Sequence, residues 1–317
     1  HEKADVYVIN TCTVTNIADR KSRQMLHRAR KLNPDAVIVA AGCYVQAQEE
    51  AGTKIEGIDI LIGNNQKKNL IALLHDYEQH EDVKAVIDIN HTGEFEELYV
   101  DSAGDHTRAY IKIQDGCNQF CTYCIIPYIR GQYRSFPMED LLQEAKNLAS
   151  SGVKELILIA QETTVYGMDC YGRKALPELL TKFCEIEGIE WIRILYCYPE
   201  EITDELIAVM KKEKKVCHYL DIPIQHSEDT ILKRMGRRTN RAELISLVEK
   251  LRKEIPDIVL RTTLITGFPG ETEEEFNNMV DFVDKMEFDR LGVFPYSAEE
   301  GTKAAEMDGQ IPEDIKE

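Results

Sequence analysis

The chain has 317 residues, with 38 Lys and Arg against 56 Asp and Glu, and a formal net charge of −18 at pH 7. Such a charge repels phosphate and excludes nonspecific nucleic-acid binding by the whole surface, so any RNA contact has to be local. The length predicts two domains, and no apolar run approaches the roughly 20 residues of a membrane span. We expect no membrane partner.

The cysteine content indicates the compartment. Nine cysteines without a visible signal peptide favour a reducing cytoplasm, where thiols remain available as metal ligands. Both ends look cut, because the chain begins just before a predicted strand and residues 311–317 read like a linker. We therefore expect a fragment.

Strands alternate with helices over the first 90 residues. Apolar, β-branched runs occupy residues 5–10, 36–41, 58–63 and 83–89, and helical patterns occupy about 18–31, a shorter stretch after residue 43, and about 67–76. This alternation predicts an α/β domain over residues 1–95 with a doubly wound parallel sheet, whose ligands lie at the carboxyl ends of the strands.

Two cysteines follow strands of this sheet. Cys12 and Cys43 each stand just past a predicted strand end, so we expect them on the same rim. Two thiols on one rim could bind a metal cluster or could be structural.

The helix over residues 19–31 contains six Lys and Arg in an otherwise acidic chain. It is either a solvated helix face or a patch that contacts the phosphates of a folded RNA. The candidate RNA contacts are Arg20, Lys21 and Arg23.

Residues 96–107 are polar and acidic and read as an interdomain linker. From residue 108 to 317 six apolar runs recur with helices between them, at 109–114, 154–160, 191–196, 219–222, 258–265 and 290–294. They predict an open six-unit (β/α) barrel, whose functional groups gather at the carboxyl ends of the strands. Gln161, Gln225 and Gly267 are the candidate ligand contacts there.

Three cysteines in one short stretch carry the chemistry. Cys117, Cys121 and Cys124 are separated by three and then two residues, after a predicted strand and Gly116. Three thiolates are one too few for a closed structural site, so one iron of a four-iron cluster would stay open to a small molecule. The alternatives are a zinc knuckle with a distant fourth ligand such as His106, or buried apolar thiols.

This spacing, with an aromatic residue before the third cysteine, resembles the radical S-adenosylmethionine (SAM) signature. The resemblance implies that the open iron chelates SAM and that reductive cleavage gives a 5'-deoxyadenosyl radical. It also implies that Tyr123 stacks on adenine. Arg261 is a candidate partner for the SAM carboxylate, although a strand arginine also suits a structural ion pair, and His226 is expected to be a hydrogen-bonded cavity residue.

The flanks of Cys12 and Cys43, Val-Ile-Asn-Thr-Cys-Thr-Val-Thr-Asn and Ala-Ala-Gly-Cys-Tyr-Val-Gln, resemble the N-terminal domain of the methylthiotransferase family. The resemblance implies a second 4Fe-4S cluster, with Cys12 and Cys43 as its second and third ligands and the first ligand upstream of the chain. The family's C-terminal TRAM domain is expected to be absent after Glu317.

The sequence resembles two different branches of that family. Residues 5–128 look like the MtaB branch, which modifies threonylcarbamoyladenosine in tRNA, and the rest looks like the RimO branch, which modifies the β-carbon of an aspartate in a small-subunit ribosomal protein. The reacting carbon lies in the barrel cavity, so the barrel decides the substrate and favours the ribosomal protein. The resemblance further implies a sulfur-transferring transferase (EC class 2.8.4), a reductase or flavodoxin-type electron donor and a sulfur donor. The alternative of another class is a noncatalytic iron–sulfur or zinc-binding module.

Overall fold

A computed structural model describes residues 3–52, 55–78, 83–90, 92, 96, 104 and 106–316. The chain divides into two compact units: residues 1–98, 123–132 and 297–305 form the first, and residues 99–122, 133–296 and 306–317 form the second. Most of the predicted linker lies outside the described residues, so the linker and the domain limits at 95 and 108 stay predictions.

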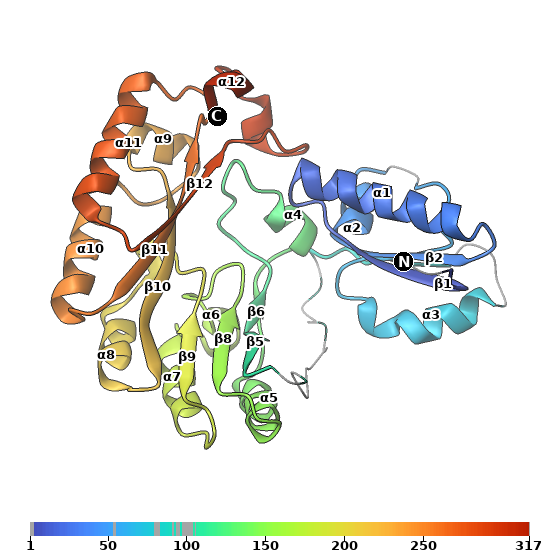
Figure 1. Cartoon of the computed structure of the whole chain (residues 1–317), viewed down its shortest axis with the longest axis horizontal. Coiled ribbons are helices and arrows are strands. Elements are labelled where there is room, and N and C mark those ends of the chain that lie inside the picture. Colours follow the sequence, from blue (N-terminus) through green and yellow to red (C-terminus); the bar gives the residue numbers. More distant parts are fainter. Residues whose placement is uncertain are drawn as a thin grey trace. The chain divides into compact units, whose positions relative to one another are not determined.

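The first unit contains a parallel sheet with helices on both faces (Figure 1). Its strands lie in the sequential order β1 (Val6–Thr11), β2 (Val37–Gly42), β3 (Ile60–Ile62) and β4 (Val83–Ala85). On one face Ile38 and Ala40 pack in a core with α1 (Asn16–Leu32) and α2 (Cys43–Glu50). On the other, Val39 and Ala41 pack with α3 (Leu70–Tyr77). The predicted doubly wound parallel sheet is confirmed, although β3 and β4 are shorter than expected.

Helix α1 carries its own start and stop signals. The Thr15 side chain caps it by accepting from the Ala18 N–H at 3.2 Å, and Asp19 lies in the first turn where the helix dipole favours an anion. Arg30 and Lys31 lie in the last turn. These signals explain why α1 begins shortly after the end of β1 and where it stops.

The second unit contains a six-stranded parallel sheet, in agreement with the prediction. The strand order is β12-β11-β10-β9-β8-β5, and none of the described residues pairs β12 with β5, so the sheet is open. The strands are β5 (Arg108–Lys112), β8 (Glu155–Ile159), β9 (Trp191–Ile194), β10 (Val216–Gln225), β11 (Val259–Thr266) and β12 (Arg290–Pro295).

Helices connect these strands and cover one side of the sheet (Figure 1). The longer ones are α5 (Met138–Ser150), α7 (Leu176–Cys184), α8 (Asp204–Lys212), α10 (Arg241–Glu254) and α11 (Glu273–Met286), and the shorter ones are α6 (Met168–Tyr171), α9 (Asp229–Arg234) and α12 (Glu313–Lys316). Reciprocal capping boxes begin α10 and α11, and Glu273, Glu274 and Glu275 occupy the first turn of α11. Within the described residues, no helix has the length and apolarity to cross a bilayer.

Gly267, just after β11, has a φ of +71°, and a Cβ there would overlap the Cγ of Lys316. We expect Gly267→Ala to lower the free energy of unfolding by about 2–3 kcal/mol, because the left-handed backbone costs roughly 1–2 kcal/mol and the contact adds to it. Gly172→Ala is the matched control, since Gly172 has a φ of +67° and open space around it. If urea denaturation gives the same loss of unfolding free energy for both variants, the contact with Lys316 does not contribute to the effect at Gly267.

Candidate active site

The loop with the three cysteines lies between two short strands. β6 (Gln114–Asp115) pairs antiparallel with β7 (Arg134–Ser135). Cys117 and Cys121 are buried, and Cys124 is partly exposed. Residues 117–122, the cluster loop, are held on one side because the Thr122 N–H and hydroxyl donate to the carbonyls of Met235 and Arg234, both at 2.9 Å.

Cys121 has two polar neighbours from distant parts of the chain. Its Sγ lies 3.3 Å from the Tyr198 hydroxyl and 3.9 Å from Nη1 of the buried Arg237, whose guanidinium stacks 4.0 Å from the centroid of the Tyr198 ring. A guanidinium and a hydroxyl are both hydrogen-bond donors, so they can donate to a sulfur that lies next to them. This donor set fits an iron–sulfur cluster, which is bound by thiolates and adjusted by hydrogen bonds to its sulfurs.

Among the described residues, no three Cys, His, Asp or Glu side chains lie close enough together to bind one metal ion. The zinc alternative that used His106 therefore has no three-ligand core in that part of the chain. The ligand roles of Cys117, Cys121 and Cys124 in a cluster stay predictions, since each thiolate of a four-iron cluster binds a different iron.

A cavity of about 390 Å³ adjoins the cluster loop. Cys117 and Glu162 line it, together with Asn118, Gln119, Tyr133, Val165, Met168, Lys174, Glu201 and Arg238. It combines a thiol, a buried carboxyl group and two cations in one small space. Such a site suits a ligand with both positive and negative groups.

Glu162 follows β8 and is almost fully buried. Its Oε1 accepts from the Thr164 N–H at 3.0 Å, from the Thr164 hydroxyl and from the Tyr198 N–H at 3.4 Å, whereas Oε2 has no hydrogen-bond partner among the described residues. Burial raises the pKa of this carboxyl group to about 7. A buried carboxylate oxygen without a donor is costly, and a cationic ligand would satisfy it.

Sequence reasoning missed Glu162 and selected its neighbour Gln161. The Oε1 of Gln161 is also buried without a hydrogen-bond partner in the described part of the chain. Residues that follow a strand alternate in direction, and only the fold decides which of the two faces the thiols. The sequence did contain one signal for Glu162, which is a carboxylate soon after the end of an apolar strand.

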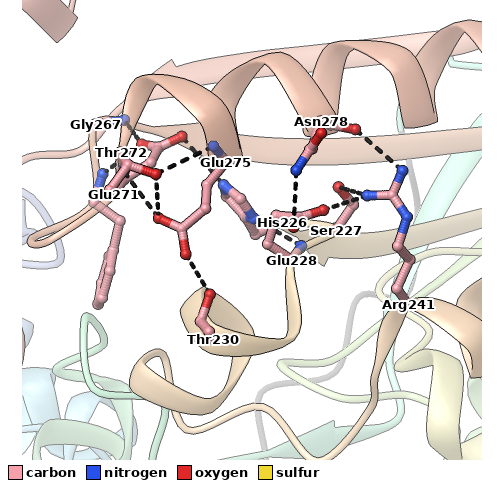
Figure 2. A network of polar contacts seen from close by, with 11 residues as sticks. His226, Ser227, Glu228, Thr230, Arg241, Gly267, Glu271, Thr272, Glu275 and Asn278 are labelled. Carbon is pink, nitrogen blue, oxygen red and sulfur yellow. Dashed lines mark hydrogen bonds and ion pairs between the residues drawn. The ribbon is translucent and has the colours of Figure 1, made fainter.

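The loop after β11 is organised around Glu271 (Figure 2). The Glu271 side chain is 3% exposed, accepts from the Gly267 and Phe268 N–H groups, and lies 3.1 Å from Nε2 of the fully buried His226. The Glu228 N–H donates to Nδ1 of His226 at 3.0 Å, which leaves Nε2 as the proton donor to Glu271. The expected hydrogen-bonded role of His226 is confirmed.

We expect Glu271→Ala to lower the free energy of unfolding by about 3 kcal/mol, because it leaves two backbone N–H groups and a buried imidazole without their acceptor. Glu274→Ala, at an exposed position in the first turn of α11, should change it by less than about 0.5 kcal/mol. Chemical denaturation of both variants checks the contrast. Similar values for the two would show that Glu271 does not hold the loop.

The other predicted SAM contacts are placed differently. Arg261 donates from Nη1 to Asp221 at 2.8 Å, which is the structural ion pair that its position in a strand also allowed. Arg261 lies five residues before the end of β11, which is about 16 Å along the strand at roughly 3.3 Å per residue. Gly267 packs against Lys316, Gln225 ends β10 with a φ of +72°, and Tyr123 is half-buried. Their SAM roles stay predictions.

The register of the first sheet brings Cys12 and Cys43 to one edge. Thr11 is paired with Gly42, and each cysteine comes one residue later, so the expected shared rim is present. Asn64 follows β3. Its Nδ2 lies 3.6 Å from the Cys43 Sγ and donates to the carbonyl of Ile129 at 2.7 Å. Asn64 is a neighbour of this thiol that the sequence did not reveal.

Beside the same edge lies a cavity of about 520 Å³ in the first unit. Arg20 and Arg23 of α1 line it together with Thr13, directly after Cys12. Arg20, Lys21 and Arg23 are exposed, and Arg23 is paired with Asp19 at 2.7 Å. Arg20 and Arg23 therefore share a cavity with the residue that follows Cys12, and the second cluster and the contact of this helix with RNA stay predictions.

Comparison with known proteins agrees with this fold. Residues 111–283 match the model of the radical SAM superfamily, and residues 1–63 match an uncharacterized protein family, UPF0004. Among solved structures, the radical SAM methyltransferase TsrM from Kitasatospora setae, with cobalamin and a 4Fe-4S cluster bound, gives a TM-score of 0.65 at 15% identity over 93% of this chain and 62% of that chain. At that identity the likeness concerns the fold alone.

Curated relatives are much closer. The chain is 52% identical to the ribosomal protein uS12 methylthiotransferase RimO of Lachnoclostridium phytofermentans, over 99% of this chain and 72% of the relative. It is 45% identical to RimO of Desulfitobacterium hafniense, over 100% of this chain and 72% of the relative. These alignments include the first 128 residues, which resemble MtaB, as well as the barrel. The chain belongs to the RimO family of radical SAM methylthiotransferases.

Proposed function

We propose that this chain transfers a methylthio group to the β-carbon of an aspartate in ribosomal protein uS12. The observation that carries the proposal is the 52% identity to a uS12 methylthiotransferase across 99% of the chain, which includes both compact units. The buried thiols of Cys117 and Cys121 and the unpaired oxygen of Glu162 support the same chemistry. We assign the reaction to the sulfur-transferring transferases, EC class 2.8.4, in the cytoplasm.

Two cysteine groups would hold the iron–sulfur clusters: Cys117, Cys121 and Cys124 the cluster that binds SAM, and Cys12 and Cys43 the second one. When bound, SAM and the first cluster supply a 5'-deoxyadenosyl radical that abstracts hydrogen from an unactivated carbon. A sulfur donor replenishes the sulfur that leaves with the product.

The protein supplies the placement. Glu162 offers its Oε2 to the ammonium group of SAM inside the cavity next to Cys117. Arg237 and Tyr198 place two hydrogen-bond donors next to the Cys121 sulfur. Glu271 fixes the loop after β11 by binding its backbone N–H groups. Each of these groups is held by its own partners, which keeps the site rigid.

The net charge of −18 favours a basic partner such as a ribosomal protein loop, because opposite charge accelerates association. The competing substrate is tRNA, which the exposed Arg20 and Lys21 of α1 would suit. The two substrates differ in chemical class, so mass spectrometry separates them.

The test uses cells that lack the gene and the same cells carrying it again. We expect the methylthio group on the uS12 aspartate to disappear with the gene and to return with it, while methylthiolated tRNA nucleosides stay unchanged. Reconstituted protein should release 5'-deoxyadenosine from SAM with dithionite. A loss confined to the tRNA nucleosides, or a protein without SAM cleavage, would refute the proposal.

A further inference from the structure

A run of cations borders the cluster loop. The sequence Lys233-Arg234-Met235-Gly236-Arg237-Arg238 carries four positive charges in six positions, in a chain whose net charge is −18. It begins in the last turn of α9 and continues into the segment that precedes α10. Arg237 faces inward to Cys121, as described above. That contact accounts for the position of Arg237, but not for Lys233, Arg234 and Arg238.

This run lies directly against the cluster loop. The carbonyls of Arg234 and Met235 accept from Thr122, and a Cβ at Gly236 would be 3.5 Å from the Phe120 carbonyl oxygen. The Arg238 Nη2 donates to the Gln119 side chain. The backbone of the run therefore follows residues 119–122 from one end to the other.

The positive charge of this surface is not neutralised. Lys233, Arg234 and Arg238 are exposed, and no carboxylate in the described part of the chain forms an ion pair with any of them. Arg234 and Arg238 donate to neutral oxygens, the Asp308 carbonyl and the Gln119 amide. Of the carboxylates that share the cavity with Arg238, Glu201 is paired with Lys174 at 2.7 Å and Glu162 is buried.

The cluster loop that this run contacts also contains an exposed apolar residue. Phe120 is 48% exposed, has a φ of +49° and directly precedes Cys121. Aromatic residues and arginine are both enriched in protein–protein interfaces, so an exposed phenylalanine in a loop that arginines contact suits a docking surface. Its position in the cluster loop places that contact next to the sulfur of Cys121.

We propose that Phe120, Lys233, Arg234 and Arg238 form a docking surface for an acidic one-electron carrier protein that reduces the cluster bound by Cys121. The proposal rests on the proposed function, which requires such an electron. The carrier loses one electron, the cluster gains it, and no atom is transferred. Acidic carriers are attracted to this surface, whereas the basic ribosomal substrate is repelled from it, so the same charges separate the two partners.

The test compares the variant Phe120→Ser/Lys233→Glu with the matched control Phe276→Ser/Lys253→Glu. The control changes the same residue types, because Phe276 is 40% exposed and Lys253 is exposed at the end of α10, without an ion pair among the described residues. The two variants have equal net charge. Any difference between them therefore depends on position.

The first readout is the affinity of each cluster-free protein for purified oxidised flavodoxin, by isothermal titration calorimetry. We expect the docking variant to raise Kd about tenfold at low salt, which corresponds to about 1.4 kcal/mol, and the control to leave it unchanged. High salt should remove most of the difference, because it screens exposed charges. Equal affinities for the two variants would overturn the proposal, as would a variant that instead loses affinity for RNA.

The second readout is 5'-deoxyadenosine formation by the reconstituted proteins. With limiting flavodoxin and its reductase the docking variant should be about tenfold slower than the control, whereas with dithionite the two rates should be equal. An equal loss with dithionite would assign Phe120 and Lys233 to the structure of the loop and overturn docking. If wild type forms no 5'-deoxyadenosine with dithionite, the proposed function fails, while the calorimetry still decides the docking surface.

Discussion

Replacing Cys121 with alanine is expected to reduce SAM cleavage to background. The Cys121 sulfur is buried and lies close to the Tyr198 hydroxyl and the Arg237 guanidinium, so its loss removes a predicted ligand and the atom next to these two donors. With only two of the three predicted ligands left, Cys117 and Cys124, we expect the cluster to be lost. Iron and sulfide content, the visible absorbance of the cluster and 5'-deoxyadenosine release measure the effect.

Cys170→Ala is the control, because Cys170 is exposed on α6. It should keep the cluster and the activity. Full iron content in the Cys121 variant would show that this thiol is not a ligand. The far-UV circular dichroism of both variants has to match wild type for the comparison to hold.

Replacing Glu162 with glutamine should raise stability and weaken SAM binding in the same protein. Burial raises the pKa of Glu162 from its ordinary value of 4.5 to about 7. Between these two values the folded state holds a proton that the unfolded state has released, so stability falls as pH rises through that window. Above pH 7 the buried charge costs about 3 kcal/mol, and a neutral glutamine avoids this cost.

We therefore expect Glu162→Gln to be more stable than wild type by up to about 3 kcal/mol at pH 8, and by much less at pH 5. Its affinity for SAM should fall at least tenfold, because the amide offers no negative charge to the ammonium group. Urea denaturation at both pH values and equilibrium dialysis with SAM measure the two effects. Glu205→Gln, an exposed position on α8, should change neither. A stability gain that is equal at pH 5 and pH 8 would contradict the titration of Glu162.

The sequence predicted the architecture well because runs of apolar residues alternate with helical patterns in both units, and this alternation is typical of parallel α/β sheets. The runs at 58–63 and 83–89 were exceptions, since the strands there are only Ile60–Ile62 and Val83–Ala85. Cys12 and Cys43 were found on one rim for the same reason, because residues after adjacent parallel strands meet at one edge.

The details of the site could not be predicted in the same way. Tyr198 and Arg237 reach Cys121 from 77 and 116 residues away in the sequence, and no local pattern connects them. Arg261 has a sequence position that suits a ligand and an ion pair equally, and only the register that pairs it with Asp221 shows which contact forms. Long-range packing decides these contacts, and single-sequence patterns do not contain it.

The anchoring of Thr122 to Arg234, the last residue of α9, and to Met235 has a consequence for the lifetime of the holoprotein. α9 is a six-residue helix, and such short elements open locally at a lower free energy than the whole fold. Each opening would release the peptide next to Cys121 and expose a ligand bond to oxygen or chelator. The rate at which bleaching occurs in air should therefore follow hydrogen exchange in residues 229–236, and a stiffer α9 should yield a longer-lived enzyme without any change to its cysteines.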